Sequence, residues 1–217
     1  RSSRVVTLRE PTDALPVVVS STNCPHLQSG LSDWYSVAWP GGTPPAPGAD
    51  VTLPRGSRVL ISRTVREQLG VLTIPSDAQL IIGENTTSTI RLDAAGIVVH
   101  GQLHAGSETC RLVTPIEITL HGARPSTRAA RDALPPWTKG IYVTGGQLNL
   151  HGKQYHRTWT RLARAVQPGD TIILLQAPVN WESGQEIVLV TSALKDARDW
   201  HRNEVHTVAR VTTDPAA

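Results

Sequence analysis

Three segments of the chain repeat one short pattern: residues 72–83 read LTIPSDAQLIIG, residues 97–106 read IVVHGQLHAG, and residues 141–152 read IYVTGGQLNLHG. Each combines a β-branched stretch, a tight bend, the pair Gln-Leu, a second stretch rich in apolar residues and a glycine. Gln79, Gln102 and Gln147 are separated by 23 and 45 residues, close to one and two copies of a single period, and Ile116–Gly122 offers a strand for the missing copy. Such a period suits one coil of a parallel β-solenoid, because each coil buries its Ile, Val and Leu against the next.

The rest of the chain also favours strands. Short stretches with period-two alternation and β-branched enrichment run from Asp50 to Thr212, which predicts an all-β protein. Helical turns are expected only at Leu162–Val166 and Ala193–Arg202. A β-sandwich whose hairpins share a Gly-Gln-Leu turn remains the alternative to a solenoid.

Composition narrows the class of protein. The 217 residues fit one β-rich domain with a small appendage, and 17 glycines with 16 prolines favour turns over a helical bundle. A net charge of +3 is too small to indicate a nucleic-acid binder. No apolar run reaches the roughly 18 residues of a membrane span. The start at Arg1, without a signal-peptide core, suggests a piece of a longer polypeptide.

Two weak signals point to an oxidising compartment outside the cell. Cys24 and Cys110 lack the spacing of a zinc site, so they form either one long-range disulfide or two free thiols. Asn85 opens the glycosylation sequence Asn85-Thr86-Thr87. Disulfides and N-glycans are both typical of extracellular proteins.

Several motifs resemble the G-eight domain, an extracellular module named for its eight glycines. It occurs in fibrocystin-like proteins and in hyaluronan-binding and hyaluronan-degrading proteins. The resemblance rests on the following stretches: WPGGTPP at 39–45, GQLHAGS at 101–107, ITLHG at 118–122, GGQLNLHG at 145–152 and WTRL at 159–162.

The resemblance implies more than the residues alone. Residues 168–188 are similar to the fibrocystin-like branch, for which a right-handed parallel β-helix is expected, with the Trp/Pro/Gly-rich segment at 34–48 capping it. A Cys-Pro before that segment matches Cys24-Pro25, which implies a disulfide from Cys24 to Cys110. The expected division is an extended lead-in or linker at 1–23, the eight-glycine domain at 24–165, and the start of a following β-rich segment at 166–217.

Three histidines each end an expected strand and precede a glycine: His100, His121 and His151. In stacked coils they would form a column of imidazoles able to bind metal or move protons near neutral pH. The alternative is a hydrogen-bonded histidine ladder at the corners of the repeats.

Basic and aromatic residues gather in residues 124–139, the proline-rich stretch. Its arginine forks could bind carboxylates, and its aromatic faces could stack on sugar rings. The candidate glycan-binding residues are Arg124, Arg128, Arg131, Trp137 and Lys139. A second group follows at Lys153, Tyr155, His156, Arg157 and Trp159. The alternative is a solvated arginine loop with Trp137 and Trp159 buried as anchors.

These observations predict a non-catalytic extracellular interaction module of a larger cell-surface or secreted protein. Its expected partner is an acidic polysaccharide or an extracellular protein, and no cofactor or metal is expected, with structural calcium at turns left open. The rival is a hyaluronan-type polysaccharide depolymerase, whose candidate catalytic residues are His100, His104, His121 and His151. A third interpretation is a structural spacer that covers an open β edge.

Overall fold

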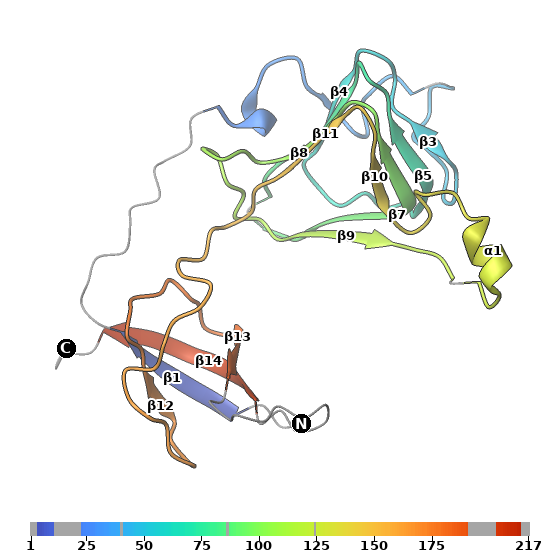
Figure 1. Ribbon diagram of the computed structural model, residues 1–217. Helices are drawn as coiled ribbons and strands as arrows, with labels where there is room; N and C mark the ends of the chain where they lie inside the picture. The colour runs from blue at the N-terminus through green and yellow to red at the C-terminus, as the bar shows by residue number, and fades with distance from the viewer. Residues whose placement is uncertain are drawn as a thin grey trace. The chain divides into compact units, whose positions relative to one another are not determined.

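The computed structural model describes residues 4–10, 23–39, 41–85, 87–123, 125–190 and 203–213. The chain divides into two compact units, Val19–Gln154 and a second one made of Arg1–Val18 with Tyr155–Ala217. Strands predominate in both (Figure 1), so the expected all-β class is confirmed. The expected boundaries at 23 and 165 differ from this division.

The larger unit contains two five-stranded sheets, and all their strand pairs are parallel. From β2 to β8, successive strands alternate between the two sheets, whereas β9 and β10 both belong to the second. The strand order is β11-β8-β6-β4-β2 in the first sheet and β10-β7-β5-β3 in the second, with β9 also paired to β7. The first sheet consists of β2 (Ser32–Asp33), β4 (Arg58–Ile61), β6 (Gln79–Ile82), β8 (Gln102–Ala105) and β11 (Gln147–Leu150). The second consists of β3 (Val51–Thr52), β5 (Leu69–Ile74), β7 (Ile90–Val99), β9 (Ile116–Leu120) and β10 (Ile141–Val143).

The repeated Gln-Leu pairs stack in register. Gln79 pairs with Gln102 and Gln102 with Gln147, and the leucines that follow them pair in the same way. On the outer face, Gln79 Nε2 donates to Gln102 Oε1 at 2.8 Å. On the inner face, Leu80 and Leu103 are fully buried in the core, whereas Leu148 on the last strand is partly exposed. The repeat therefore encodes strand register, with polar and apolar ladders on opposite faces.

The expected right-handed β-helix is wrong, because the described strands form multiple separate sheets and no closed solenoid. β8 pairs directly with β11, so the separation of 45 positions between Gln102 and Gln147 is a single step of the sheet that carries a long insertion. The segment Ile116–Gly122 is not a missing copy. Its strand β9 lies beside Ile90–Ala94 of β7, while β10 lies beside Ile97–Val99 of the same strand.

The two tryptophans of the Trp/Pro/Gly-rich segment belong to the core of the larger unit, whereas residues 41–48 are almost all exposed. Trp34 and Trp39 are buried, with ring centroids 4.8 Å apart in an edge-to-face arrangement. Trp39 Nε1 also donates to the carbonyl of Trp34 at 2.9 Å. Two short helical elements lie in the same unit: η1 (Pro25–Leu27) and α1 (Arg128–Asp132). α1 was not expected, although Thr127 caps it by accepting from the amide of Ala130 at 3.3 Å.

The smaller unit is one four-stranded sheet in the order β12-β1-β14-β13. Its strands are β1 (Arg4–Glu10), β12 (Ile172–Leu174), β13 (Glu186–Leu189) and β14 (Glu204–Thr213). β1 lies inside this sheet, parallel to both neighbours, where an extended lead-in was expected.

Of the two expected helical turns, the one at Leu162–Val166 is wrong and the other is not described. Leu162 forms an antiparallel bridge with Leu175 in place of a helical turn. Ala193–Arg202 lies outside the described residues. Among the described residues, no helix combines the length and apolar character that crossing a lipid bilayer requires.

Candidate functional site

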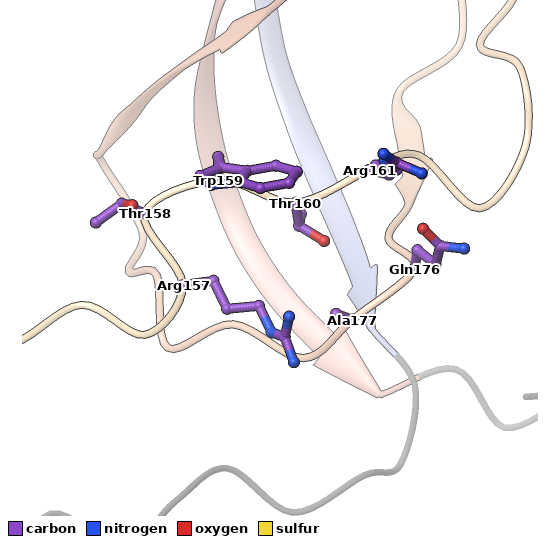
Figure 2. Close-up of a pocket in the computed structure, with 7 residues that line it drawn as sticks. All are labelled: Arg157, Thr158, Trp159, Thr160, Arg161, Gln176 and Ala177. Carbon is purple, nitrogen blue, oxygen red and sulfur yellow. The ribbon is translucent and has the colours of Figure 1, made fainter.

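A depression of about 340 Å³ lies on the smaller unit, around the indole of Trp159. Residues 157–161, which form most of its lining, are hydrogen-bonded at both ends to other residues of the smaller unit. Trp181 Nε1 donates to the carbonyl of Arg157 at 2.8 Å, and the amide of Gln176 donates to the carbonyl of Arg161 at 2.9 Å. Figure 2 shows the residues that line the depression: Arg157, Thr158, Trp159, Thr160, Arg161, Gln176 and Ala177.

The chemistry of the depression is basic, aromatic and polar. Trp159 is 69% exposed, so the sequence-based alternative of a buried Trp159 anchor is wrong. Arg157 and Arg161 are exposed too, and within the described part of the chain neither forms an ion pair with a carboxylate. Two guanidinium groups without a carboxylate partner, beside an accessible indole, suit an anionic ligand with a flat face.

Of the residues that line the depression, Arg157 and Trp159 were expected from the sequence as candidate glycan-binding residues, whereas Arg161 and Gln176 were not. The signal for Arg161 was the symmetry of the stretch Arg157-Thr158-Trp159-Thr160-Arg161, which flanks one tryptophan with two threonines and two arginines. Gln176 carried no signal, because only the backbone pairing of 161–163 with 174–176 brings it there.

Three basic side chains of the proline-rich stretch contact nearby groups of the chain. Arg131 donates to the carbonyls of Pro125 and Ser126 at 3.1 and 3.0 Å, and Lys139 Nζ donates to the carbonyl of Gly122 at 3.1 Å. Arg128 is highly exposed and lies 3.6 Å from Asp132. Trp137 packs at a tilt beside Tyr142, with ring centroids 6.3 Å apart. Arg124 lies outside the described residues.

The structure does not gather His100, His121 and His151 into a column. His100 contacts the carbonyl of Thr144 at 3.3 Å, and His121 Nε2 lies 3.3 Å from Asp93 Oδ1. His151 follows β11, where its amide donates to the carbonyl of Ala105 at 2.7 Å. Among the residues that the structure describes, these three histidines do not form a group of ring nitrogens that could hold a metal ion.

His104 has both ring nitrogens engaged. Nε2 contacts Gln102 Oε1 at 2.9 Å and Nδ1 contacts Asn149 Nδ2 at 3.2 Å, as a neutral imidazole with its proton on Nε2 would. Burial lowers the pKa of His104 below 6.5, and the nearby Arg58 and His151 lower it further. A neutral, hydrogen-bonded imidazole of this kind is poorly placed to act as a general acid at neutral pH.

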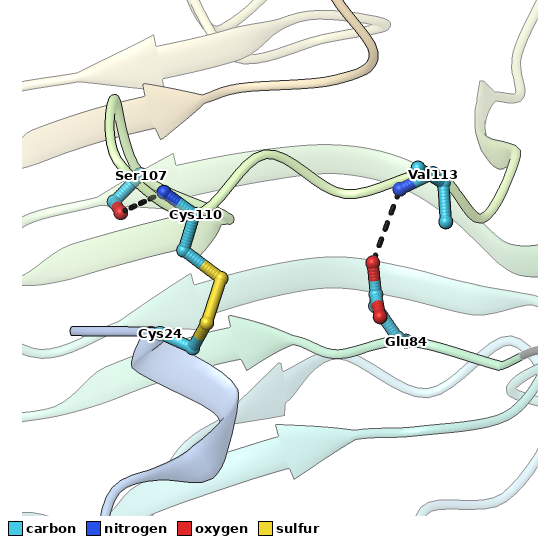
Figure 3. The surroundings of a disulfide bond; sticks show 5 residues. All are labelled: Cys24, Glu84, Ser107, Cys110 and Val113. Atoms are coloured by element: carbon cyan, nitrogen blue, oxygen red, sulfur yellow. Dashed lines mark hydrogen bonds between the residues drawn. A yellow bond between two sulfur atoms is a disulfide. The ribbon is translucent and has the colours of Figure 1, made fainter. Parts of the chain in front are cut away.

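The disulfide implied by the resemblance is present (Figure 3). It joins Cys24, just before η1, to Cys110, in the loop after β8, with the Cα atoms 5.1 Å apart. The backbone amide of Cys110 also donates to Ser107 Oγ at 3.0 Å. The bond thus ties the start of the larger unit to a loop 86 residues further along the chain.

Asn85 lies in a hydrogen-bonded turn at the surface. Its Oδ1 accepts from the amide and the hydroxyl of Thr87 at 3.0 and 2.8 Å. Its Nδ2, the atom that a glycan would modify, donates to the carbonyl of Ser62 at 3.2 Å. N-glycosylation of Asn85 would therefore require the hydrogen bond from Nδ2 to the carbonyl of Ser62 to break.

Comparison with known proteins places the chain in a family. The G8 domain family matches residues 38–163, which confirms the resemblance to the G-eight domain. A G8 domain-containing protein of Dictyostelium discoideum is 35% identical over 97% of this chain, and Communication mutant protein F of the same organism is 34% identical over 97%. Human Fibrocystin-L is 33% identical over 83% of the chain.

The relatives are much longer than this chain. It spans 15% of the first of these proteins, 19% of the second and 4% of Fibrocystin-L. No solved structure matches it. The family match covers more than half of the residues, so this chain belongs to the G8 domain family.

Proposed function

We propose that this chain is an extracellular, non-catalytic interaction module that binds an acidic polysaccharide at the Trp159 depression. The observation that carries the proposal is the exposed indole between two arginines that lack a carboxylate partner among the described residues. Guanidinium groups bind carboxylates and sulfates bidentately, and an indole face stacks on a sugar ring. The threonines and Gln176 supply further hydrogen-bonding groups for hydroxyls.

Three observations support an extracellular setting. The Cys24–Cys110 disulfide is of the kind that persists in oxidising compartments. Asn85 belongs to a glycosylation sequence. The similarity to Fibrocystin-L and to long Dictyostelium proteins fits a module within a larger cell-surface or secreted polypeptide.

Support for a depolymerase is weaker. Among the described residues, His100, His104, His121 and His151 do not form a group of ring nitrogens that could hold a metal ion. Both ring nitrogens of His104 are hydrogen-bonded, and burial lowers its pKa. In the proline-rich stretch Arg131 and Lys139 bind backbone carbonyls. Arg128 and Trp137 would be the site instead if the Trp159 depression does not bind the glycan.

The test is binding of size-defined hyaluronan and heparan sulfate to the 217-residue chain, with the length of the polysaccharide measured in the same samples. We expect binding that weakens with salt, without shortening of the polymer. Arg157→Ala should weaken binding about tenfold, because a hydrogen bond to a charged group contributes about 1.5 kcal/mol or more. Trp159→Ala should weaken binding up to about tenfold, because it removes the indole face that stacks on a sugar ring.

Arg128→Ala is the matched control, since it removes an exposed arginine from the proline-rich stretch of the other unit. Its binding should equal that of the unmodified chain. Loss of binding in Arg128→Ala with retention in Trp159→Ala would move the site to the proline-rich stretch. Absence of binding to both polysaccharides would refute the glycan proposal, and shortening would refute the non-catalytic one.

A further inference from the structure

His26 lies beside the disulfide with an unexplained buried nitrogen. One ring nitrogen of His26 and the sulfur atoms of Cys24 and Cys110 all lie within 4.8 Å of one another. Both cysteines are buried, and His26 Nδ1 is buried without a hydrogen-bond partner among the described residues. A buried polar atom without a partner destabilises the fold, so an imidazole with such an atom beside two sulfur atoms calls for a chemical explanation.

The backbone around this cluster holds all three side chains in place. The amide of Leu27 donates to the carbonyl of Cys24 at 3.1 Å, which closes the turn that carries His26. Ser107 and Cys110 exchange two backbone hydrogen bonds, of 2.8 and 3.2 Å. A Cβ atom added to Gly83 on the sheet below would lie 3.3 Å from His26 Cβ, so His26 packs closely over this glycine. None of these contacts depends on the disulfide bond itself.

We propose that reduction of the disulfide converts this cluster into a zinc site with two cysteine ligands and one histidine ligand. A dithiol or phosphine reductant supplies two electrons, the sulfur–sulfur bond breaks, and each sulfur gains a proton. Zn²⁺ then displaces both thiol protons, which leave to the solvent, and binds two thiolates and the imidazole. Thiolates and imidazole are the ligands that Zn²⁺ prefers, and a water molecule completes the tetrahedron.

The consequence is that one loop has two alternative crosslinks. The oxidised chain joins Cys24 to Cys110 covalently, and the reduced chain joins the same residues through the metal. Because zinc binds the ordered ligand set better than the unfolded chain, it stabilises the reduced larger unit. This inference is independent of the proposed glycan binding, which concerns the other unit.

The experiment uses the 217-residue chain reduced with a phosphine under anaerobic conditions. Zinc is titrated against a chromophoric chelator, and thermal unfolding is followed with and without zinc. We expect one zinc per reduced chain, a rise in the unfolding temperature of the larger unit, and no binding to the oxidised chain. His26→Ala should bind zinc more weakly by more than about tenfold, since even outer-sphere partners of zinc ligands contribute that much.

His156→Ala is the matched control, because this histidine lies in the other unit and should leave zinc affinity unchanged. Cys24→Ser with Cys110→Ser should abolish binding. The proposal is overturned if the reduced chain binds no zinc, or if His26→Ala binds it as tightly as the unmodified chain. It is equally overturned if the reduced chain is unfolded and zinc does not restore its thermal transition.

Discussion

At the scale of single residues, the polar ladder on the outer face of the first sheet is a linked network. Arg58 Nε donates to Gln79 Oε1 at 2.9 Å, Gln79 donates to Gln102, and Gln102 accepts from His104. Asn149 on the next strand contacts the second nitrogen of His104. Protonation of that nitrogen would place an N–H against the amide of Asn149, so the network favours the neutral imidazole together with burial and Arg58.

The lowered pKa of His104 predicts a loss of stability in acid. Below 6.5, the usual pKa of histidine, the unfolded chain binds a proton at this site more readily than the folded chain does. The free energy of unfolding should therefore fall as the pH decreases from 6.5 towards the lowered pKa, and then level off. Chemical denaturation of the larger unit between about pH 8 and pH 5 measures this effect.

His104→Gln is the informative comparison, because glutamine hydrogen-bonds but does not titrate. We expect its stability to change less over this pH range, whatever its stability at pH 8. Parallel pH profiles for the two proteins would contradict the role assigned to His104.

At the scale of elements, the bends before the Gln-Leu strands depend on glycine. Gly101 precedes Gln102 and Gly146 precedes Gln147 in the repeat. A Cβ atom at Gly101 would lie 2.1 Å from the carbonyl oxygen of Pro75 and 2.2 Å from that of Ala78. A Cβ atom at Gly146 would lie 2.4 Å from the carbonyl oxygen of Gly101. Each bend therefore rests directly on the backbone of the preceding repeat.

Gly101→Ala should lower the free energy of unfolding of the larger unit by at least about 1–3 kcal/mol. The reason is that the backbone at Pro75 and Ala78 must shift to accommodate the added methyl group. Gly152→Ala is the matched control, since nothing lies within 4 Å of a Cβ atom there. Denaturant titration of both variants measures the difference. Equal stability of the two variants would show that the bends do not stack as described.

At the scale of the whole molecule, the smaller unit combines both ends of the described chain. Val6 and Leu8 of β1 are buried against Ile173, Leu175, Val179 and Val208. β1 also hydrogen-bonds to β12 on one side and to β14 on the other. Without β1, this sheet would lose its central connection and part of its core.

Deletion of residues 1–18 should therefore abolish folding of the smaller unit and leave the larger one folded. The larger unit has its own core and the whole Cys24–Cys110 loop. Calorimetry of the intact chain should show two transitions, and the truncated chain should retain only that of Val19–Gln154. Persistence of both transitions after truncation would contradict the central place of β1.

Local pattern in the sequence was enough to predict most strands of the chain. Period-two alternation located them to within a few residues, although β1 and β2 were not expected, and the Gln-Leu repeat identified equivalent positions on one face. Burial of Leu80 and Leu103 supports the register in which these positions pair. The family resemblance supplied the disulfide partners, which spacing alone left open.

The pairing of strands that are distant in sequence could be read only from the three-dimensional structure. Contacts between remote residues determine the division into two sheets and the pairing of β9 with β7. They also determine the place of β1 between β12 and β14. The same holds for the exposure of Trp159 and for the approach of His26 to the sulfur atoms. Local pattern specifies which face of a strand is apolar, whereas the choice of partner depends on chain closure and packing of the whole unit.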